Sequence, residues 1–172
     1  MPAYANSGDG PGSSADLFLH VQTARGGKVK GEGTTEGHED DIALRGWSWG
    51  VAAGSAIGST VATARRSFKQ LVVYKDIDSA STMLMNALVT NDEVSEAVLG
   101  MRKAGGEPLD YFRMTLNGAR VVSLDIEVDS QGQPTERVGI AFTKIEIEYK
   151  RQDSSGQSGG AYMFIDEVLQ AE

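Results

Sequence analysis

Both tryptophans of the chain lie in one short segment in which the alternation of apolar residues slips by one position. Ile42 and Leu44 hold the first phase, Trp47 and Trp49 hold the second, and Gly46 lies at the slip. Side chains on a strand alternate between its two faces, so a slip at a glycine is typical of a β-bulge or a strand bend. The segment is therefore predicted to be a strand that turns a corner between two packed surfaces.

A second long apolar segment, residues 137–150, repeats this pattern. Val138 and Ile140 hold one phase, Ile145 holds the other, and the slip lies near Thr143. A second bent strand favours a fold in which two β surfaces are joined by shared strands.

Other segments alternate without a slip, or are short apolar runs, and they predict further strands. These strands are expected at residues 17–22, 67–74, 94–103, 111–116, 122–128 and 162–168. Asn117-Gly118 is typical of a type I′ hairpin turn, which needs positive φ at both positions. One helix is predicted at about residues 80–90, with Asp78 or Ser79 as its N-cap. The sequence therefore predicts a mainly β fold, a two-sheet antiparallel β-barrel or sandwich with one flanking α-helix.

The organisation along the chain is that of a single domain, residues 16–172, preceded by a disordered N-terminal arm, residues 1–15, rich in Gly, Ser and Pro. Residues 24–40 are polar and predict a long loop. Residues 52–66 are small and interrupted by glycines, with no regular period. They predict a long surface loop, and a loop of that length in a compact domain is usually functional or disordered.

The formal charge of −8, from 16 basic and 24 acidic residues, argues against nucleic acid as a partner, because that binding depends on phosphate neutralisation. It also argues against binding to an anionic membrane. No apolar run approaches the ~20 residues that span a bilayer, and the N-terminus lacks the pattern of a secretory signal peptide. The chain contains no cysteine, which excludes disulfides and thiolate metal sites.

No residue pattern predicts catalysis, a cofactor or a metal. His20 and His38 are distant in sequence, and they are read as surface or hydrogen-bonded structural histidines. Asp125 and Glu127 alternate with apolar residues, which is most simply the solvated face of a strand. A carbohydrate-active enzyme that uses one of these two carboxylates is the weaker alternative.

The two tryptophans could form a stacking platform, but two rings on one face more often serve core or interface packing. We therefore interpret Trp47 and Trp49 as packing or interface residues. Ser48, between them, must point to the opposite face. The main alternative function is that of a monomeric ligand-binding β-barrel, with both rings facing an internal cavity.

Several motifs, in order, resemble those of the hemolysin-coregulated protein (Hcp) family over about residues 16–168. They are Lys30-Gly31-Glu32, His38, Ile42, Trp47-Ser48-Trp49-Gly50, Arg102-Lys103-Ala104-Gly105-Gly106, the strand from Tyr111, and Ile145-Glu146-Ile147-Glu148-Tyr149. The resemblance implies a ring of six subunits with an open lumen. It also implies rings that stack into the inner tube of the bacterial type VI secretion system.

The same resemblance implies a set of partners. They are other copies of the chain, a contractile sheath around the tube, a spike protein of the VgrG type at its tip, and small effector proteins in the lumen. It implies a protein that is cytoplasmic until sheath contraction and is then secreted through the type VI apparatus without a signal peptide.

The resemblance also suggests roles for particular residues. Ser48 is a candidate for facing the lumen. Six chains of −8 give a ring of −48, so stacking must depend on local contacts between rings. Arg65 and Arg66 are candidates to meet acidic residues of the next ring. The candidate ring-stacking residues are Ala53, Ser55, Ile57, Ser59, Arg65 and Arg66.

Overall fold

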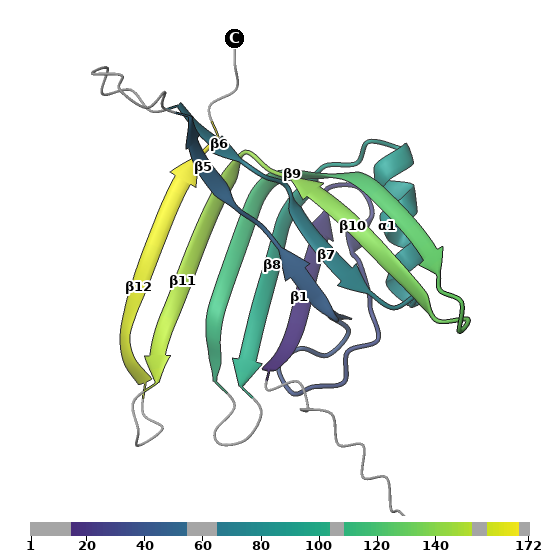
Figure 1. Ribbon diagram of the computed structural model, residues 1–172, viewed down its shortest axis with the longest axis horizontal. Coiled ribbons are helices and arrows are strands. Elements are labelled where there is room, and N and C mark those ends of the chain that lie inside the picture. The colour runs from purple at the N-terminus through teal and green to yellow at the C-terminus, as the bar shows by residue number, and fades with distance from the viewer. Residues whose placement is uncertain (1–14, 55–64, 104–108, 153–157, 169–172) are drawn as a thin grey trace, which may run out of the picture.

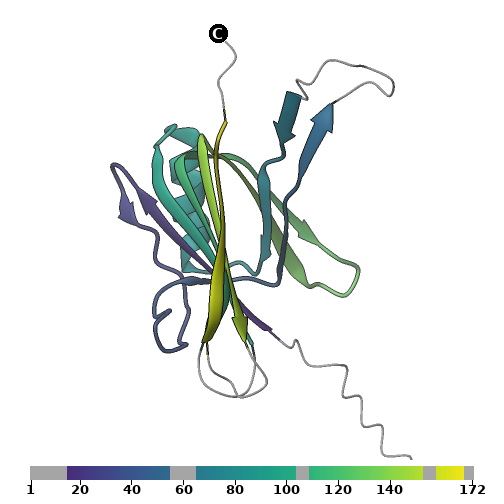
Figure 2. The same ribbon diagram turned by 90° about the vertical axis from the view of Figure 1, so that its left-hand side faces the viewer.

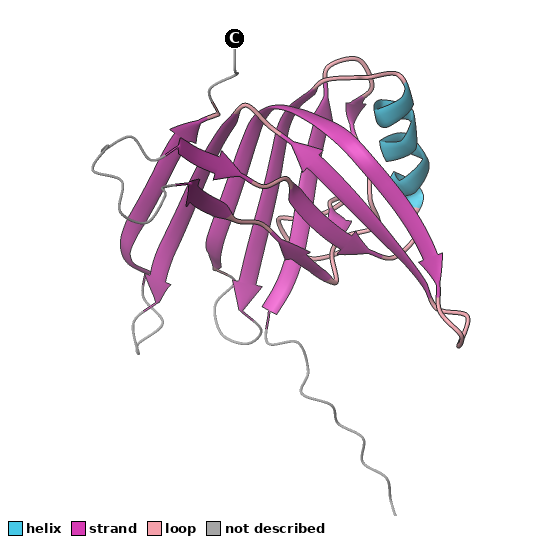
Figure 3. Cartoon of the chain, turned by 45° about the horizontal axis from the view of Figure 1, so that its top comes forward, coloured by secondary structure: helices cyan, strands magenta, loops and turns pink. Residues whose placement is uncertain are grey.

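The computed structural model of the chain describes residues 15–54, 65–103, 109–152 and 158–168. Within these residues the chain forms twelve strands and one helix (Figures 1 and 3). In chain order they are β1 (Ala15–Thr23), β2 (Gly27–Lys28), β3 (Ile42–Ala43), β4 (Gly46–Ser48), β5 (Val51–Gly54), β6 (Arg65–Phe68), β7 (Leu71–Lys75), α1 (Ser79–Val89), β8 (Val94–Lys103), β9 (Asp110–Val128), β10 (Pro134–Ala141), β11 (Lys144–Gln152) and β12 (Ser158–Glu167). The predicted arm lies outside the described residues except for its last position.

The strands pair in antiparallel fashion and build two sheets that share β9. The larger sheet has the order β2–β1–β8–β9–β11–β12, and β3 also pairs with β1. The smaller sheet has the order β9–β10–β7–β4, and β5 pairs with β6 in a separate ladder. Figure 2 shows the sheets nearly edge-on, and one cluster of buried apolar side chains from both fills the space between them. The predicted fold class is confirmed.

β9 is the long strand that belongs to both sheets. Its first part pairs with β8 and β11, and from Arg120 onward it pairs with β10. The predicted hairpin turn at Asn117-Gly118 is therefore wrong, because the strand continues through both residues. Of the two, only Gly118 has a positive φ, 53°, whereas a type I′ turn needs two in succession. Glycine is required there also because a Cβ would overlap the Thr143 hydroxyl.

Both phase slips mark points where the chain leaves one sheet for the other. β3 pairs with β1 in the larger sheet and β4 pairs with β7 in the smaller one, so the first crossing lies between Ala43 and Gly46. β10 belongs to the smaller sheet and β11 to the larger, and the second crossing lies at Phe142 and Thr143. The predicted corners are confirmed, but each predicted strand is divided at its corner into separate strands.

The prediction that residues 52–66 form a loop is wrong at both ends. β5 and β6 pair from Val51–Phe68 to Gly54–Arg65, and residues 55–64 between them lie outside the described residues. Small side chains show no alternation that could reveal a strand, although their backbone pairs normally. The predicted strand 67–74 is likewise divided, because β6 and β7 pair in different ladders.

The predicted helix is α1, and Asp78 is its N-cap. The Asp78 carboxylate accepts a hydrogen bond from the Ala80 N–H, and the Ser81 hydroxyl accepts one from the Asp78 N–H, both at 3.0 Å. This reciprocal capping box satisfies two backbone donors of the first turn. Leu84 and Ala87 lie on its buried face.

A fully buried ion pair fastens the start of α1 to the smaller sheet. Lys75 of β7 and Glu136 of β10 are opposite each other in the ladder, with Nζ and Oε2 3.2 Å apart and neither side chain exposed. The Lys75 ammonium also contacts the Asp78 carboxylate at 2.8 Å and the Ser81 hydroxyl at 3.0 Å. The Ser81 hydroxyl donates to Glu136 at 2.6 Å. Lys and Glu are almost never fully buried unless they are paired.

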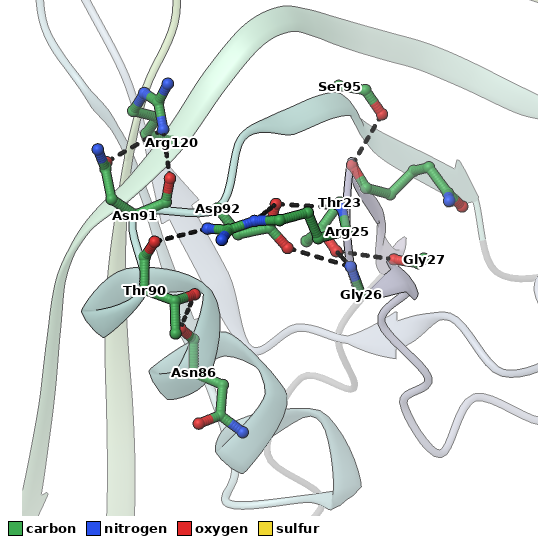
Figure 4. Close-up of polar contacts among 11 residues, drawn as sticks. Thr23, Arg25, Gly26, Gly27, Asn86, Thr90, Asn91, Asp92, Ser95 and Arg120 are labelled. Carbon is green, nitrogen blue, oxygen red and sulfur yellow. Dashed lines mark hydrogen bonds and ion pairs between the residues drawn. The ribbon is translucent and has the colours of Figure 1, made fainter.

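The end of α1 is tied to the turn after β1 (Figure 4). Asp92 is buried and accepts hydrogen bonds from the backbone N–H groups of Arg25 and Gly26, both at 3.1 Å. The Arg25 guanidinium also donates to the Thr90 carbonyl at 2.6 Å, which satisfies one of the free carbonyls at the helix end. The two ends of α1 are thus anchored to different sheets.

Candidate assembly surfaces

β12 forms an exposed apolar edge of the larger sheet. Among the described residues it pairs with β11 alone. Tyr162, Met163, Phe164 and Ile165 are consecutive on it, with exposed fractions of 60%, 57%, 43% and 55%. We call these four residues the β12 patch; Tyr162 and Phe164 lie on the core face of the sheet, and Met163 and Ile165 lie on its other face. An edge strand presents unpaired backbone groups as well, and natural proteins usually cover or blunt such an edge.

The register of the larger sheet explains why apolar residues reach this edge. Leu19, Leu99 and Met114 form one cross-strand row on the core face, and the row continues through Ile147 to Phe164. The first three are fully buried, Ile147 is half-buried and Phe164 is exposed. The core face of this sheet therefore extends past the region that the smaller sheet covers.

A second exposed apolar surface lies on the far part of β9. Ile126 and Val128 lie on one face of β9 and are 42% and 63% exposed, and we call them the β9 strip. Val122, 43% exposed, lies at the register shift between Val121 and Ser123 and is outside that alternation. The acidic residues Asp125 and Glu127 that alternate with the strip residues are exposed, as predicted. In Figure 1 the β9–β10 hairpin and β12 lie at opposite ends of the longest axis of the molecule. The subunit thus has two different exposed apolar surfaces at opposite ends of its longest axis.

The β5–β6 hairpin stands apart from both sheets (Figure 2). At its base, Phe68 stacks on Trp49 with ring centroids 6.2 Å apart and meets Phe142 edge-on at 6.3 Å. Further along, the Arg66 guanidinium contacts both carboxylate oxygens of Asp166 on β12, at 2.7 and 2.8 Å. The hairpin is therefore linked to the rest of the subunit by aromatic packing and by a two-point ion pair.

The candidate stacking residues fall partly on this hairpin. Ala53 lies in β5 with its side chain exposed, and Arg65 and Arg66 lie in β6. Ser55, Ile57 and Ser59 lie outside the described residues. Arg66 already has an acidic partner, Asp166, within its own chain.

Both tryptophans pack within the subunit. Trp47 stacks on Phe112 of β9 with centroids 5.5 Å apart, and Trp49 stacks on Phe68. Both tryptophans are half-buried against the core cluster. Each ring therefore joins segments that are far apart in the sequence.

Ser48 is exposed on the face opposite the two tryptophans. In the ladder it is opposite Val72, and the same row continues through Gly139 to Ser123. The outward face of the smaller sheet therefore carries mostly small side chains along this row. This face is the surface on which a lumen would have to form if Ser48 lines one.

The structure brings together two histidines that are far apart in sequence. The Nδ1 atoms of His20 and His38 lie 3.1 and 3.0 Å from the two carboxylate oxygens of Asp41. The Nε2 atom of His38 lies 2.8 Å from Asp110, which also accepts a hydrogen bond from Arg102 at 2.8 Å. Both ring nitrogens of His38 therefore face carboxylates. No local pattern reveals this cluster, because its members come from separate segments.

The cluster holds its carboxylates in the ionised form. Burial alone would raise the pKa of Asp41 and of Asp110, but hydrogen bonds outweigh it and both pKa values are lowered. His38 contributes to both shifts, and Arg102 contributes to that of Asp110. In the described ranges, no three or more His, Asp or Glu side chains are arranged to hold a metal ion. The histidines act here as hydrogen-bonding residues that fix the loop before β3.

The helical part of the structure can be compared with the length needed to cross a membrane. α1 has 11 residues, and none of the helices in the described part of the chain is long and apolar enough to cross a bilayer.

The chain has the fold of a two-sheet antiparallel β protein with one flanking helix, and several solved structures have a similar fold. The crystal structure of Hcp1 from Salmonella typhimurium has a TM-score of 0.73 at 24% identity, covering 90% of this chain and 95% of that one. A structure described as a type six secretion system protein has a TM-score of 0.77 at 24% identity, with coverages of 86% and 91%. These similarities establish the fold.

The family follows from the sequence. The family model described as "Type VI secretion system effector, Hcp" matches residues 18–149, so the chain belongs to the Hcp family. Protein hcp1 of Pseudomonas aeruginosa (strain PAO1) is 28% identical over 151 residues, which cover 86% of this chain and 90% of that protein. The chain is thus a secreted type VI protein of the tube and effector family.

Proposed function

We propose that the chain is the subunit of a hexameric ring that stacks into the inner tube of a bacterial type VI secretion system. The tube is wrapped by a contractile sheath, carries a spike protein of the VgrG type at its tip, and leaves the cytoplasm when the sheath contracts. Small effector proteins travel in its lumen. The observation that carries the proposal is the pair of exposed apolar surfaces at opposite ends of the subunit, together with membership of the Hcp family.

Two different surfaces at opposite ends favour a head-to-tail contact. Such a heterologous contact generates a closed ring when the rotation between neighbours closes, and no surface is then left over. Each half-exposed residue of the β12 patch would contribute about 1 kcal/mol on burial. The contact would also cover the open edge of β12. We therefore assign the ring interface to the β12 patch of one subunit and the β9 strip of its neighbour.

The assembly test compares charged substitutions on these surfaces with a matched control. Phe164→Glu on the β12 patch and Ile126→Glu on the β9 strip place a charge in the proposed interface. Val89→Glu changes an apolar residue that is 73% exposed on α1. We expect wild type and the Val89 variant to give ring particles and a six-subunit mass by light scattering. The other two variants should give single subunits.

Two outcomes would contradict this assignment. A single-subunit mass for the wild type at tens of micromolar would contradict the ring and favour the monomeric ligand-binding β-barrel. Rings formed by the Phe164 and Ile126 variants would leave the ring standing and remove these surfaces from its interface. Circular dichroism on each variant checks that the fold is retained.

The outward face of the smaller sheet is the proposed lumen surface. Ser48 is small and exposed there, so Ser48→Gln fills space without touching the packed tryptophans on the other face. We expect this variant to form rings of normal mass while losing co-purified effector cargo. Loss of folding would show that the residue is buried in the assembly and that the assignment of faces is wrong.

A further inference from the structure

We propose that the ion pair between Arg66 and Asp166 is a positioning contact that holds the β5–β6 hairpin in the direction required for one ring to stack on the next. The inference rests on the proposed function, in which this hairpin carries the stacking contacts. It assigns Arg66 a role within its own subunit, different from a direct contact with the neighbouring ring.

The geometry of the pair suits a clamp. The Arg66 Nε atom lies 2.7 Å from Asp166 Oδ2, and its terminal NH2 nitrogen lies 2.8 Å from Oδ1. This two-point arrangement fixes the plane of the guanidinium as well as its distance, which a lysine could not do. The Asp166 carboxylate is itself only 20% exposed and also accepts a hydrogen bond from the Glu167 N–H at 2.9 Å. The acceptor is therefore fixed before the arginine reaches it.

The position of Asp166 also matters. It lies opposite Ile145 in the β11–β12 ladder, and Ile145 continues the buried row of Leu116 and Ala97 on the core face. Asp166 thus stands where the apolar row reaches the sheet edge, directly after the β12 patch. The clamp connects the proposed ring interface on β12 to the proposed stacking element on β6.

The hairpin needs such a contact because little else restrains it. The β5–β6 ladder is a separate two-stranded sheet, and in the described residues no hydrogen-bonded ladder joins it to either larger sheet. All four residues of β5, Val51–Gly54, are exposed. Aromatic packing holds the base at Phe68, but a single fixed end leaves a two-stranded ribbon free to swing.

Six-fold repetition would amplify a modest restraint. An exposed ion pair shifts the population of a restrained conformation by about twofold to fivefold. If a ring stacks only when all six hairpins are in place, the factors multiply to about 60-fold to about 16,000-fold. Loss of the clamp should therefore spare ring formation and raise the protein concentration needed for tubes by at least about tenfold.

The decisive variant is the charge swap. Arg66→Ala and Asp166→Ala each remove the clamp, and the double variant Arg66→Asp with Asp166→Arg restores it in reverse. A clamp within the subunit predicts that the charge swap regains at least half of the wild-type tube formation. Arg66→Asp alone and Asp166→Arg alone should each remain defective in tube formation. An Arg66 that binds an acidic residue of the next ring predicts no rescue, because the swap then sets two acidic groups against each other.

Three measurements separate the possible outcomes. Light scattering reports the ring mass, electron microscopy over a concentration series reports tubes, and hydrogen exchange of the β5 amides in isolated rings reports hairpin restraint. We expect normal ring mass, fewer tubes and β5 exchange about twofold to fivefold faster in Arg66→Ala. Arg45→Ala removes a comparable exposed arginine from its pair with Asp76 and should leave all three unchanged.

Several results would overturn the inference. Normal tubes in Arg66→Ala, unchanged β5 exchange, or failure of the charge swap each contradict a positioning role. A wild type that forms no rings contradicts the proposed function instead. A wild type that forms rings and tubes, together with any of the three contradicting results in the variants, overturns the clamp and leaves the proposed function standing.

Discussion

Replacing Lys75 by methionine should destabilise the subunit far more than a change to an exposed lysine. The methionine keeps the apolar length of the side chain and removes the charge. The change leaves Glu136 fully buried, with the Ser81 hydroxyl as its remaining described donor, and its Oε1 atom has no hydrogen-bond partner among the described residues. The Asp78 carboxylate loses its counter-ion as well.

The size of the effect follows from this burial. Removing one member of a buried ion pair costs about 3–5 kcal/mol, because the other charge remains desolvated. With a urea dependence of about 2 kcal/mol per molar, the unfolding midpoint should fall by roughly 2 M. Lys69→Met at an exposed lysine should change the free energy of unfolding by less than about 0.5 kcal/mol.

Urea unfolding followed by tryptophan fluorescence measures both variants, at one fixed subunit concentration because the proposed assembly would add stability. The double variant Lys75→Met with Glu136→Leu should recover more than half of the loss, since the unpaired carboxylate is then absent. A midpoint shift below about 0.5 M for Lys75→Met, or no recovery in the double variant, would refute the view that the buried charges depend on each other.

Two further predictions concern the bend and the histidine cluster. Gly118→Ala should lower the free energy of unfolding by about 1–3 kcal/mol, measured by thermal unfolding. Gly160→Ala should melt like wild type, because a Cβ there meets no atom within 4 Å. Equal losses in the two variants would contradict the overlap between a Cβ at position 118 and the Thr143 hydroxyl. The pKa values of Asp41 and Asp110 are lowered in the folded state, so their stabilisation is complete above the unfolded value of about 4 and is lost as the pH falls further. Asp110→Asn should therefore weaken the fall of the urea midpoint between about pH 4 and pH 2, and an unchanged slope would contradict this role.

The alternation of apolar residues predicted the two corners correctly. Alternation is a local property of a single strand, so a slip in it can be read from the sequence alone. The slips at Gly46 and Thr143 both mark crossings between sheets. The same reading failed at Asn117-Gly118, where a motif favoured in isolated hairpins occurs inside a continuous strand. Tertiary pairing of β9 with β8 and β11 outweighed the local turn preference there.

The surface features were predicted less completely, for two physical reasons. Residues 52–54 are Ala, Ala and Gly, whose side chains are too small to show which face they occupy, so β5 was not predicted. The pairs Arg66–Asp166 and His38–Asp110 join residues 100 and 72 positions apart, and a single sequence contains no trace of such encounters. The apolar run at Tyr162–Ile165 did predict a strand, but its exposure depends on where the smaller sheet ends.

The length of β9 has a mechanical consequence for the subunit. Its 19 residues form one covalent backbone through both sheets, about 60 Å long at ~3.3 Å per residue. A shear load that tries to slide one sheet over the other would be carried along that backbone and shared by the ladders to β8, β10 and β11. The body of the subunit is therefore stiff in this direction. The β5–β6 hairpin is the more flexible part of the subunit. A stack of such subunits would therefore deform under load at the contacts between rings, while each subunit keeps its shape.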